Sequence, residues 1–123
     1  MGVGMPSDLL LQEFGSQLMY AFDTVPYHVG SSLNNKSGWR DVDVRVILDD
    51  DVWDSMGLGD PDECHDNGKW VALCLAFSLL GKQITGLPID FQLQRRTQAN
   101  ERFPGNRSAI GMTPQRRARY KDG

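Results

Sequence analysis

The sequence is poor in cysteine and contains no long hydrophobic run. Its two cysteines, Cys64 and Cys74, are too few for a disulfide framework, so we expect both to be reduced and Cys74 to lie in the core. The longest strongly apolar run, 70–80, is interrupted by polar residues and is too short to cross a membrane. The first residues offer neither a basic flank nor an apolar segment of signal-peptide length. We therefore expect a cytoplasmic protein with no membrane partner.

At 123 residues the chain is long enough for one domain with a hydrophobic core and too short for two. Its net charge of −3 hides an uneven distribution. Residues 1–66 carry thirteen acidic and three basic side chains, whereas the chain from Arg95 onward carries eight basic and two acidic ones. An acidic body with a basic end is compatible with metal binding in the first part and phosphate or nucleic-acid contact in the second. It is equally compatible with a solvated basic end that binds nothing.

Hydrophobic periodicity predicts helices and strands in alternation. Apolar side chains recur at helical spacing in two long segments, and they alternate with polar ones in shorter segments. The predicted helices are 7–22, 52–56, 69–84 and 95–103, and the predicted strands are 27–29, 41–48 and 87–94. This order predicts an α/β (α+β) fold, a small mixed β-sheet flanked by helices. Residues 1–103 would form the domain, and an irregular basic C-terminal tail would occupy 104–123.

The strand predicted over 41–48 carries two aspartates on one face. Valines occupy the opposite face, and Asp41 and Asp43 share theirs because side chains alternate along a strand. Aspartate is disfavoured in strands, and two carboxylates held side by side repel each other unless a cation lies between them. Mg²⁺ or Mn²⁺, which prefer oxygen ligands, meet that need. The alternative is a solvated face of an edge strand, where Arg45 accompanies the aspartates.

Two further features stand in the same part of the chain. Gly30-Ser31 directly follows the strand predicted over 27–29. A glycine lets the backbone approach a phosphate closely, and the amides and hydroxyls of Ser31 and Ser32 can donate to phosphate oxygens. Asp90 lies between two hydrophobic residues on a later strand. A third carboxylate of this kind would complete a two-metal site for in-line phosphoryl transfer.

At these residues the chain resembles the nucleotidyltransferase superfamily that includes polymerase beta and the minimal nucleotidyltransferases. The family pattern is a hydrophobic residue with Gly-[Gly/Ser], then Asp-hydrophobic-[Asp/Glu]-hydrophobic, and later an isolated acid between hydrophobic residues. Residues 29–31, 41–44 and 89–91 match these three parts, and the resemblance covers roughly residues 8–94. It implies the nucleotidyltransferase fold and the transfer of a nucleoside monophosphate from an NTP to a hydroxyl acceptor, with release of pyrophosphate.

The resemblance also implies roles for the carboxylates. Asp41 and Asp43 would bind the Mg²⁺ or Mn²⁺ that accompanies the nucleotide, and with Asp90 they would bind a second ion. Asp90 would accept the proton of the attacking hydroxyl. Such ions neutralise charge on the α-phosphate and on the leaving group.

The nucleotide, ATP by expectation, would be held next to these carboxylates. By the same resemblance, Gly30, Ser31 and Ser32 would hold the triphosphate. Arg40, which directly precedes the first carboxylate, would pair with the nucleotide. We treat all four as candidate nucleotide-binding residues.

The acceptor has no evident binding domain. Larger members of the superfamily add a helical domain that recognises base and acceptor, and only 33 residues follow Asp90. An RNA, protein or small-molecule acceptor would have to be recognised by the tail, by a second subunit of a homo-oligomer or by a separate protein partner. The alternative function is a non-catalytic nucleotide- or protein-binding module on the same fold, such as one half of a toxin–antitoxin-like pair. The three carboxylates favour the enzyme, and the missing domain favours the alternative.

Overall fold

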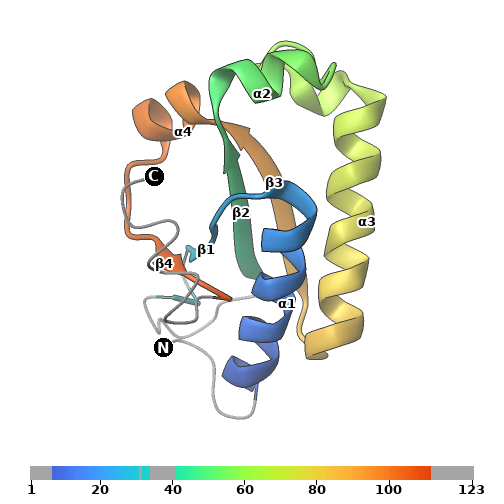
Figure 1. Ribbon diagram of the computed structural model, residues 1–123, viewed down its shortest axis with the longest axis vertical. Coiled ribbons are helices and arrows are strands. Elements are labelled where there is room, and N and C mark those ends of the chain that lie inside the picture. The colour runs from blue at the N-terminus through green and yellow to red at the C-terminus, as the bar shows by residue number, and fades with distance from the viewer. Residues whose placement is uncertain (1–6, 31, 34–40, 112–123) are drawn as a thin grey trace.

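The computed structural model of the chain describes residues 7–30, 32–33 and 41–111. They form a four-stranded mixed sheet with helices packed on it (Figure 1). The elements are, in order, α1 (Ser7–Phe22), β1 (Pro26–Val29), β2 (Val42–Leu48), α2 (Asp50–Ser55), the 3₁₀ helix η1 (Cys64–Asp66), α3 (Gly68–Thr85), β3 (Ile89–Arg95), α4 (Arg96–Arg102) and β4 (Ser108–Ala109). The predicted α+β class with a small mixed sheet is therefore confirmed.

The strands lie in the order β3-β2-β1-β4. β2 and β3 are parallel, whereas β1 is antiparallel to both β2 and β4. A parallel pair needs a long crossover connection, and the segment with α2, η1 and α3 provides it. The register of β2 and β3 decides which of their side chains face each other on the open side of the sheet.

One face of the sheet is buried under α1 and α3. The valines of β2 alternate inward, as predicted, and pack with Phe91 and Leu93 of β3 against Phe14 of α1. α1 and α3 approach closely at Gly81, because a Cβ there would lie only 2.8 Å from the Phe14 ring. Since this face holds the core, the polar residues that alternate with it must lie on the opposite face.

α3 also protects the outer edge of β3. The helix begins after Asn67, whose side chain accepts from the Trp70 amide, and ends before Gly86 at φ +73°. The Phe91 amide donates to the Ser78 hydroxyl at 2.9 Å, and the Trp70 indole donates to the Leu93 carbonyl at 2.9 Å. These bonds satisfy backbone groups that an edge strand leaves unpaired. No helix in the described residues, α3 included, is long and apolar enough to span a membrane.

The chain after Pro104 is not irregular throughout, contrary to the prediction from sequence. β4 pairs with β1 through Tyr27 and Ala109. Ile110 is fully buried, and the Gly111 amide donates to the Gln12 side chain of α1 at 2.8 Å. Residues up to 111 therefore pack with the domain, and the rest of the predicted tail, 112–123, lies outside the described residues. A two-residue strand is too short to show alternation.

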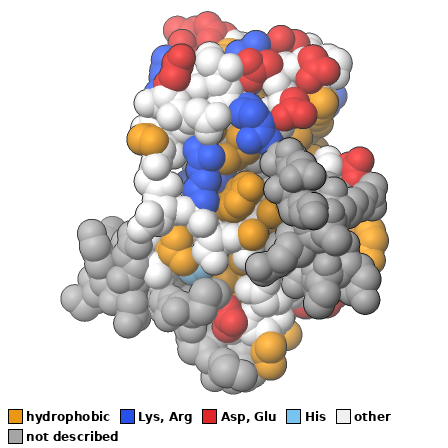
Figure 2. Space-filling view, turned by 60° about the vertical axis from the view of Figure 1, so that its left-hand side comes forward, with side chains coloured by type: hydrophobic (Ala, Val, Ile, Leu, Met, Phe, Trp, Pro, Cys, Tyr) orange, Lys and Arg blue, Asp and Glu red, His pale blue; other side chains and the backbone are white. Residues whose placement is uncertain are grey.

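The acidic and basic halves of the sequence neutralise each other at one end of the molecule. Four ion pairs join them, namely Arg95–Asp50 at 3.4 Å, Arg95–Asp54 at 3.1 Å, Arg96–Asp49 at 2.8 Å and Arg102–Asp62. Acidic side chains gather at the upper end of the face shown in Figure 2, where α2 and α4 lie. Some of the acidic and basic side chains that are unevenly distributed in the sequence therefore serve to hold the fold together. The sequence analysis considered only ligand contact or a solvated end for the basic residues.

Candidate active site

Asp43 and Asp90 face each other across the parallel strands β2 and β3. The two residues are partners in the register of the pair, and alternation places both on the face opposite the helices. Their carboxyl groups contact each other, and their side chains remain 25% and 40% exposed. Two acidic groups are therefore held together by the backbone of the sheet at a position that solvent and ligands can reach.

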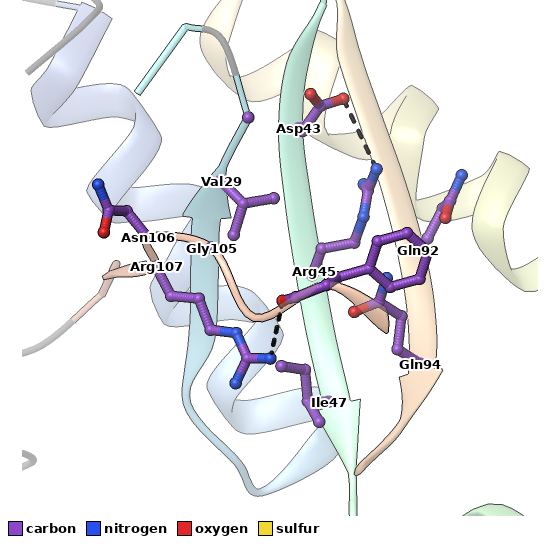
Figure 3. Close-up of a pocket in the computed structure, with 11 residues that line it drawn as sticks. Val29, Asp43, Arg45, Ile47, Gln92, Gln94, Gly105, Asn106 and Arg107 are labelled. Atoms are coloured by element: carbon purple, nitrogen blue, oxygen red, sulfur yellow. Dashed lines mark hydrogen bonds and ion pairs between the residues drawn. The ribbon is translucent and has the colours of Figure 1, made fainter. Parts of the chain in front are cut away.

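The guanidinium of Arg45 lies beside both carboxylates. Its Nη2 is 3.7 Å from a carboxylate oxygen of Asp43 and 3.7 Å from one of Asp90. Its Nη1 donates to the Asp90 carbonyl at 2.7 Å and to the Val44 carbonyl at 3.1 Å. Figure 3 shows Arg45 reaching along β2 toward Asp43. Arg45 thus supplies part of the positive charge that the sequence argument assigned to a metal ion.

The electrostatics of Asp43 favour additional positive charge. Burial raises the pKa of the Asp43 carboxyl above its ordinary value, and the charge of Arg45 opposes that rise. The charges of Asp90 and Asp41 raise the same pKa further, as does the hydrogen bond between the carboxyl groups of Asp43 and Asp90. The ionised form is therefore under-compensated, which is the condition in which a carboxylate pair gains from a divalent cation.

Asp41 does not converge with the other two carboxylates. It is exposed and immediately precedes β2, and its influence on Asp43 is electrostatic. Within residues 7–30, 32–33 and 41–111, no three His, Cys, Asp or Glu side chains are grouped closely enough to hold a metal ion. Asp43 and Asp90 fit two oxygen ligands of a hard cation, and the predicted set of three is not assembled.

Gly30 lies directly against Asp43. It adopts φ +83°, a conformation that side-chain-bearing residues rarely adopt, and a Cβ at this position would collide with the Asp43 carboxylate. The glycine is therefore required by the aspartate next to it as well as by the turn that ends β1. The sequence pattern placed these two residues in one site, and the structure has them in contact range.

The remaining candidate nucleotide-binding residues divide into two groups. The Ser32 side chain is fully buried, and its hydroxyl lies 2.7 Å from Nε2 of the equally buried His28. It points into the core and does not line the pocket described next. Ser31 and Arg40 lie outside the described residues.

A pocket of about 370 Å³ opens beside Asp43 and Gly30, within the size range of small-molecule sites. Figure 3 shows Asp43 at one end, with Ile47 and Arg107 at the other. Sequence reasoning missed six of its lining residues, although the alternation from Asp90 pointed to two of them, Gln92 and Gln94. Those six are Ile47 of β2, Gln92 and Gln94 of β3, and Phe103, Gly105 and Asn106 of the loop between α4 and β4.

Of the basic residues from Arg95 onward that the structure describes, only Arg107 lines this pocket. Arg95 and Arg96 instead pair with the acidic residues after β2. Asp49 and Asp50 are the acceptors of these ion pairs, and the Thr97 amide also donates to Asp50 at 3.0 Å. This cluster fixes α4 to the end of the sheet.

Comparisons of the chain with protein families, with curated proteins and with solved structures found no match.

Proposed function

We propose that this chain is a metal-dependent nucleotidyltransferase of the polymerase-beta type. It transfers a nucleoside monophosphate from an NTP, with ATP the expected donor, to a hydroxyl acceptor and releases pyrophosphate. The observation that carries the proposal is the contact of Asp43 with Asp90 on neighbouring parallel strands, beside Gly30 and at the end of a pocket. Two adjacent carboxylates outside the core repel each other and do not stabilise a sheet. Binding of a cationic ligand explains why they lie together.

In this proposal Asp43 and Asp90 would hold Mg²⁺ or Mn²⁺. Asp41, which precedes β2 and is not grouped with them in the structure, would have to move toward them to become the third ligand. The bound ion would supply charge neutralisation at the α-phosphate and the leaving pyrophosphate. Asp90, the more exposed of the contacting pair, accepts the proton of the attacking hydroxyl. Gly30 allows the backbone after β1 to lie against the phosphates next to Asp43. Arg45 holds the two carboxylates in place before the nucleotide binds.

The second candidate is a non-catalytic nucleotide- or protein-binding module on the same fold. Arg45 favours it, because a guanidinium already lies 3.7 Å from each carboxylate. If that pairing were permanent, the carboxylates would not be free to bind a cation, and the pocket alone would act as a docking site. The enzyme is preferred because a single guanidinium, 3.7 Å from each of two carboxylates, leaves the pair under-compensated.

Calorimetric titration with ATP and Mn²⁺ separates the two. The wild type and an Asp66→Asn control, altered at an exposed acid in η1, should bind equally. Asp43→Asn should lose nucleotide binding in Mn²⁺. If Asp43→Asn binds ATP as the wild type does, the proposed metal site is wrong. Binding of ATP without any divalent cation would favour the non-catalytic module.

A further inference from the structure

The pocket extends well beyond the groups that the proposed chemistry uses. It follows β2 from Asp43 past Arg45 to Ile47 (Figure 3). At about 3.3 Å per residue, the two ends are roughly 13 Å apart along the strand. Asp43 and Gly30 occupy only the first end. The far end is thus distant enough to hold a different part of a ligand whose phosphates lie at Asp43.

The far end combines apolar surface with unused amides. Ile47 and Phe103 supply the apolar part. Gln94 lies opposite Ile47 in the register of β2 and β3, and Gln92, opposite Arg45, projects from the same face midway along the pocket. Within the described part of the chain, neither glutamine amide makes a side-chain hydrogen bond. Each amide offers donors and an acceptor in one plane, the pattern that pairs with the edge of a nucleobase.

Phe103 is an aromatic ring left open at this end. It directly follows α4 and is 59% exposed, and it lines both this pocket and a neighbouring one. Hydrophobic and basic side chains adjoin each other on the face that carries α4 and β4 (Figure 2). An exposed ring at a pocket rim is a platform on which a base can stack.

Arg107 fixes the position of Phe103. Its guanidinium donates to the Phe103 carbonyl and the Ala99 carbonyl at 3.2 Å each, and to Asn100 Oδ1 at 3.1 Å. All three acceptors are uncharged. Arg107 therefore connects the loop after α4 to α4 itself, and these hydrogen bonds hold the backbone of Phe103 in place.

We propose that the Ile47–Phe103 end of the pocket binds the nucleobase of the NTP, with the base stacked on Phe103 and its edge bonded to Gln92 and Gln94. The inference rests on the proposed function, because the phosphates must lie at Asp43. Stacking accepts every base, so the two amides decide which base is preferred. Arg107 is a positioning residue that acts through Phe103.

Paired titrations with ATP and with inorganic triphosphate, both in Mn²⁺, test the inference. Phe103→Leu should weaken ATP binding on the order of ten-fold and leave triphosphate binding unchanged, because only ATP carries a base. Phe103→Trp, which keeps an aromatic ring at this position, should bind ATP about as tightly as the wild type. The matched control is Leu79→Ala, since Leu79 on α3 is also 59% exposed and lies away from the pocket.

The possible results distinguish a failure of the proposed nucleobase site from a failure of the proposed nucleotidyltransferase function. If Phe103→Leu weakens both ligands equally, or neither, Phe103 is no base platform and the inference is wrong. It is also wrong if the wild type binds triphosphate as tightly as ATP. A wild type that binds neither ligand overturns the proposed function itself. Circular dichroism confirms that each variant is folded before it is titrated.

Discussion

His28 Nε2 lies 2.7 Å from the Ser32 hydroxyl oxygen, and both side chains are completely buried beneath the turn that follows β1. The other ring nitrogen, Nδ1, is buried and has no hydrogen-bond partner among residues 7–30, 32–33 and 41–111. An unpaired nitrogen that carries no proton costs less than an unpaired N–H, so the favoured neutral form has Nε2 donating to Ser32. The pair links the last residues of β1 to the turn that places Gly30 against Asp43.

This burial predicts a loss of stability in mild acid. Burial lowers the pKa of His28 below its ordinary value of 6.5, although the Asp8 carboxylate opposes the change. Below pH 6.5 the unfolded chain therefore binds a proton that the folded chain resists, and the free energy of unfolding falls as the pH falls toward the folded-state pKa. Above pH 6.5 the contribution is fully present.

Urea denaturation at pH 7.5 and pH 5.5 measures the effect. The chain contains only two histidines, so His65→Gln, altered in an exposed ring, is the matched control for His28→Gln. The wild type and His65→Gln should lose stability between the two pH values, and His28→Gln should lose less. Equal losses in all three proteins would show that His28 is not the group responsible.

Asp43→Asn should raise stability while it removes function. Because the pKa of Asp43 is raised by burial, the folded state loses stability as the pH rises above 3.8 and the carboxyl ionises. At pH 7 the neutral amide avoids that cost. We expect a higher Tm for Asp43→Asn than for the Asp66→Asn control. A lower Tm would mean that the ion pair with Arg45 outweighs the burial of the charge.

Gly30→Ala should be destabilised more than another glycine of similar backbone geometry. Gly57 has φ +72° and open space around its Cβ position, whereas Gly30 has φ +83° with Asp43 in the way. Gly57→Ala therefore measures backbone strain alone, about 1 kcal/mol. The excess cost of Gly30→Ala should shrink when Asp43 is also changed to alanine. A double-mutant cycle by urea denaturation gives this coupling, and additive effects would contradict the proposed contact.

Arg45→Met should strengthen the response to Mn²⁺. The guanidinium competes with a cation for Asp43 and Asp90, so its removal frees the carboxylates. Saturating Mn²⁺ should stabilise Arg45→Met by about 1 kcal/mol more than the wild type, a Tm difference of roughly 4–8 °C. Thermal melts with and without Mn²⁺ provide the comparison. If Mn²⁺ raises the Tm of the two proteins equally, Arg45 does not compete with the metal ion for these carboxylates.

Much of the fold was predictable because periodicity reports burial directly. The inward valines of β2 and the helical stripe of α3 are repeated over enough residues to be visible. The turn glycine and Asp43 were predicted to share a site, and they lie in contact range. The parallel register that puts Asp43 opposite Asp90 depends on the crossover through α3, so the sequence alone suggested it only through the family pattern.

Other features depended on contacts between distant segments. β4 is defined by its pairing with β1, and its two residues carry no signal of their own. Ser32 was expected to donate to phosphate, but a buried histidine four residues earlier holds its hydroxyl in the core. The far end of the pocket joins β2, β3 and the loop after α4, which no local pattern could bring together.

Transfer of a labelled nucleotide is the decisive measurement of the proposed activity. ATP labelled at the α-phosphate and ATP labelled at the γ-phosphate are incubated separately with the protein, Mn²⁺ and a cell lysate. A nucleotidyltransferase should place the α label on an acceptor and the γ label in pyrophosphate. Asp43→Asn and Asp90→Asn should abolish both products, and Asp66→Asn should not. Transfer of the γ label to an acceptor, or α-label transfer that survives in Asp43→Asn and Asp90→Asn, would contradict the proposed activity.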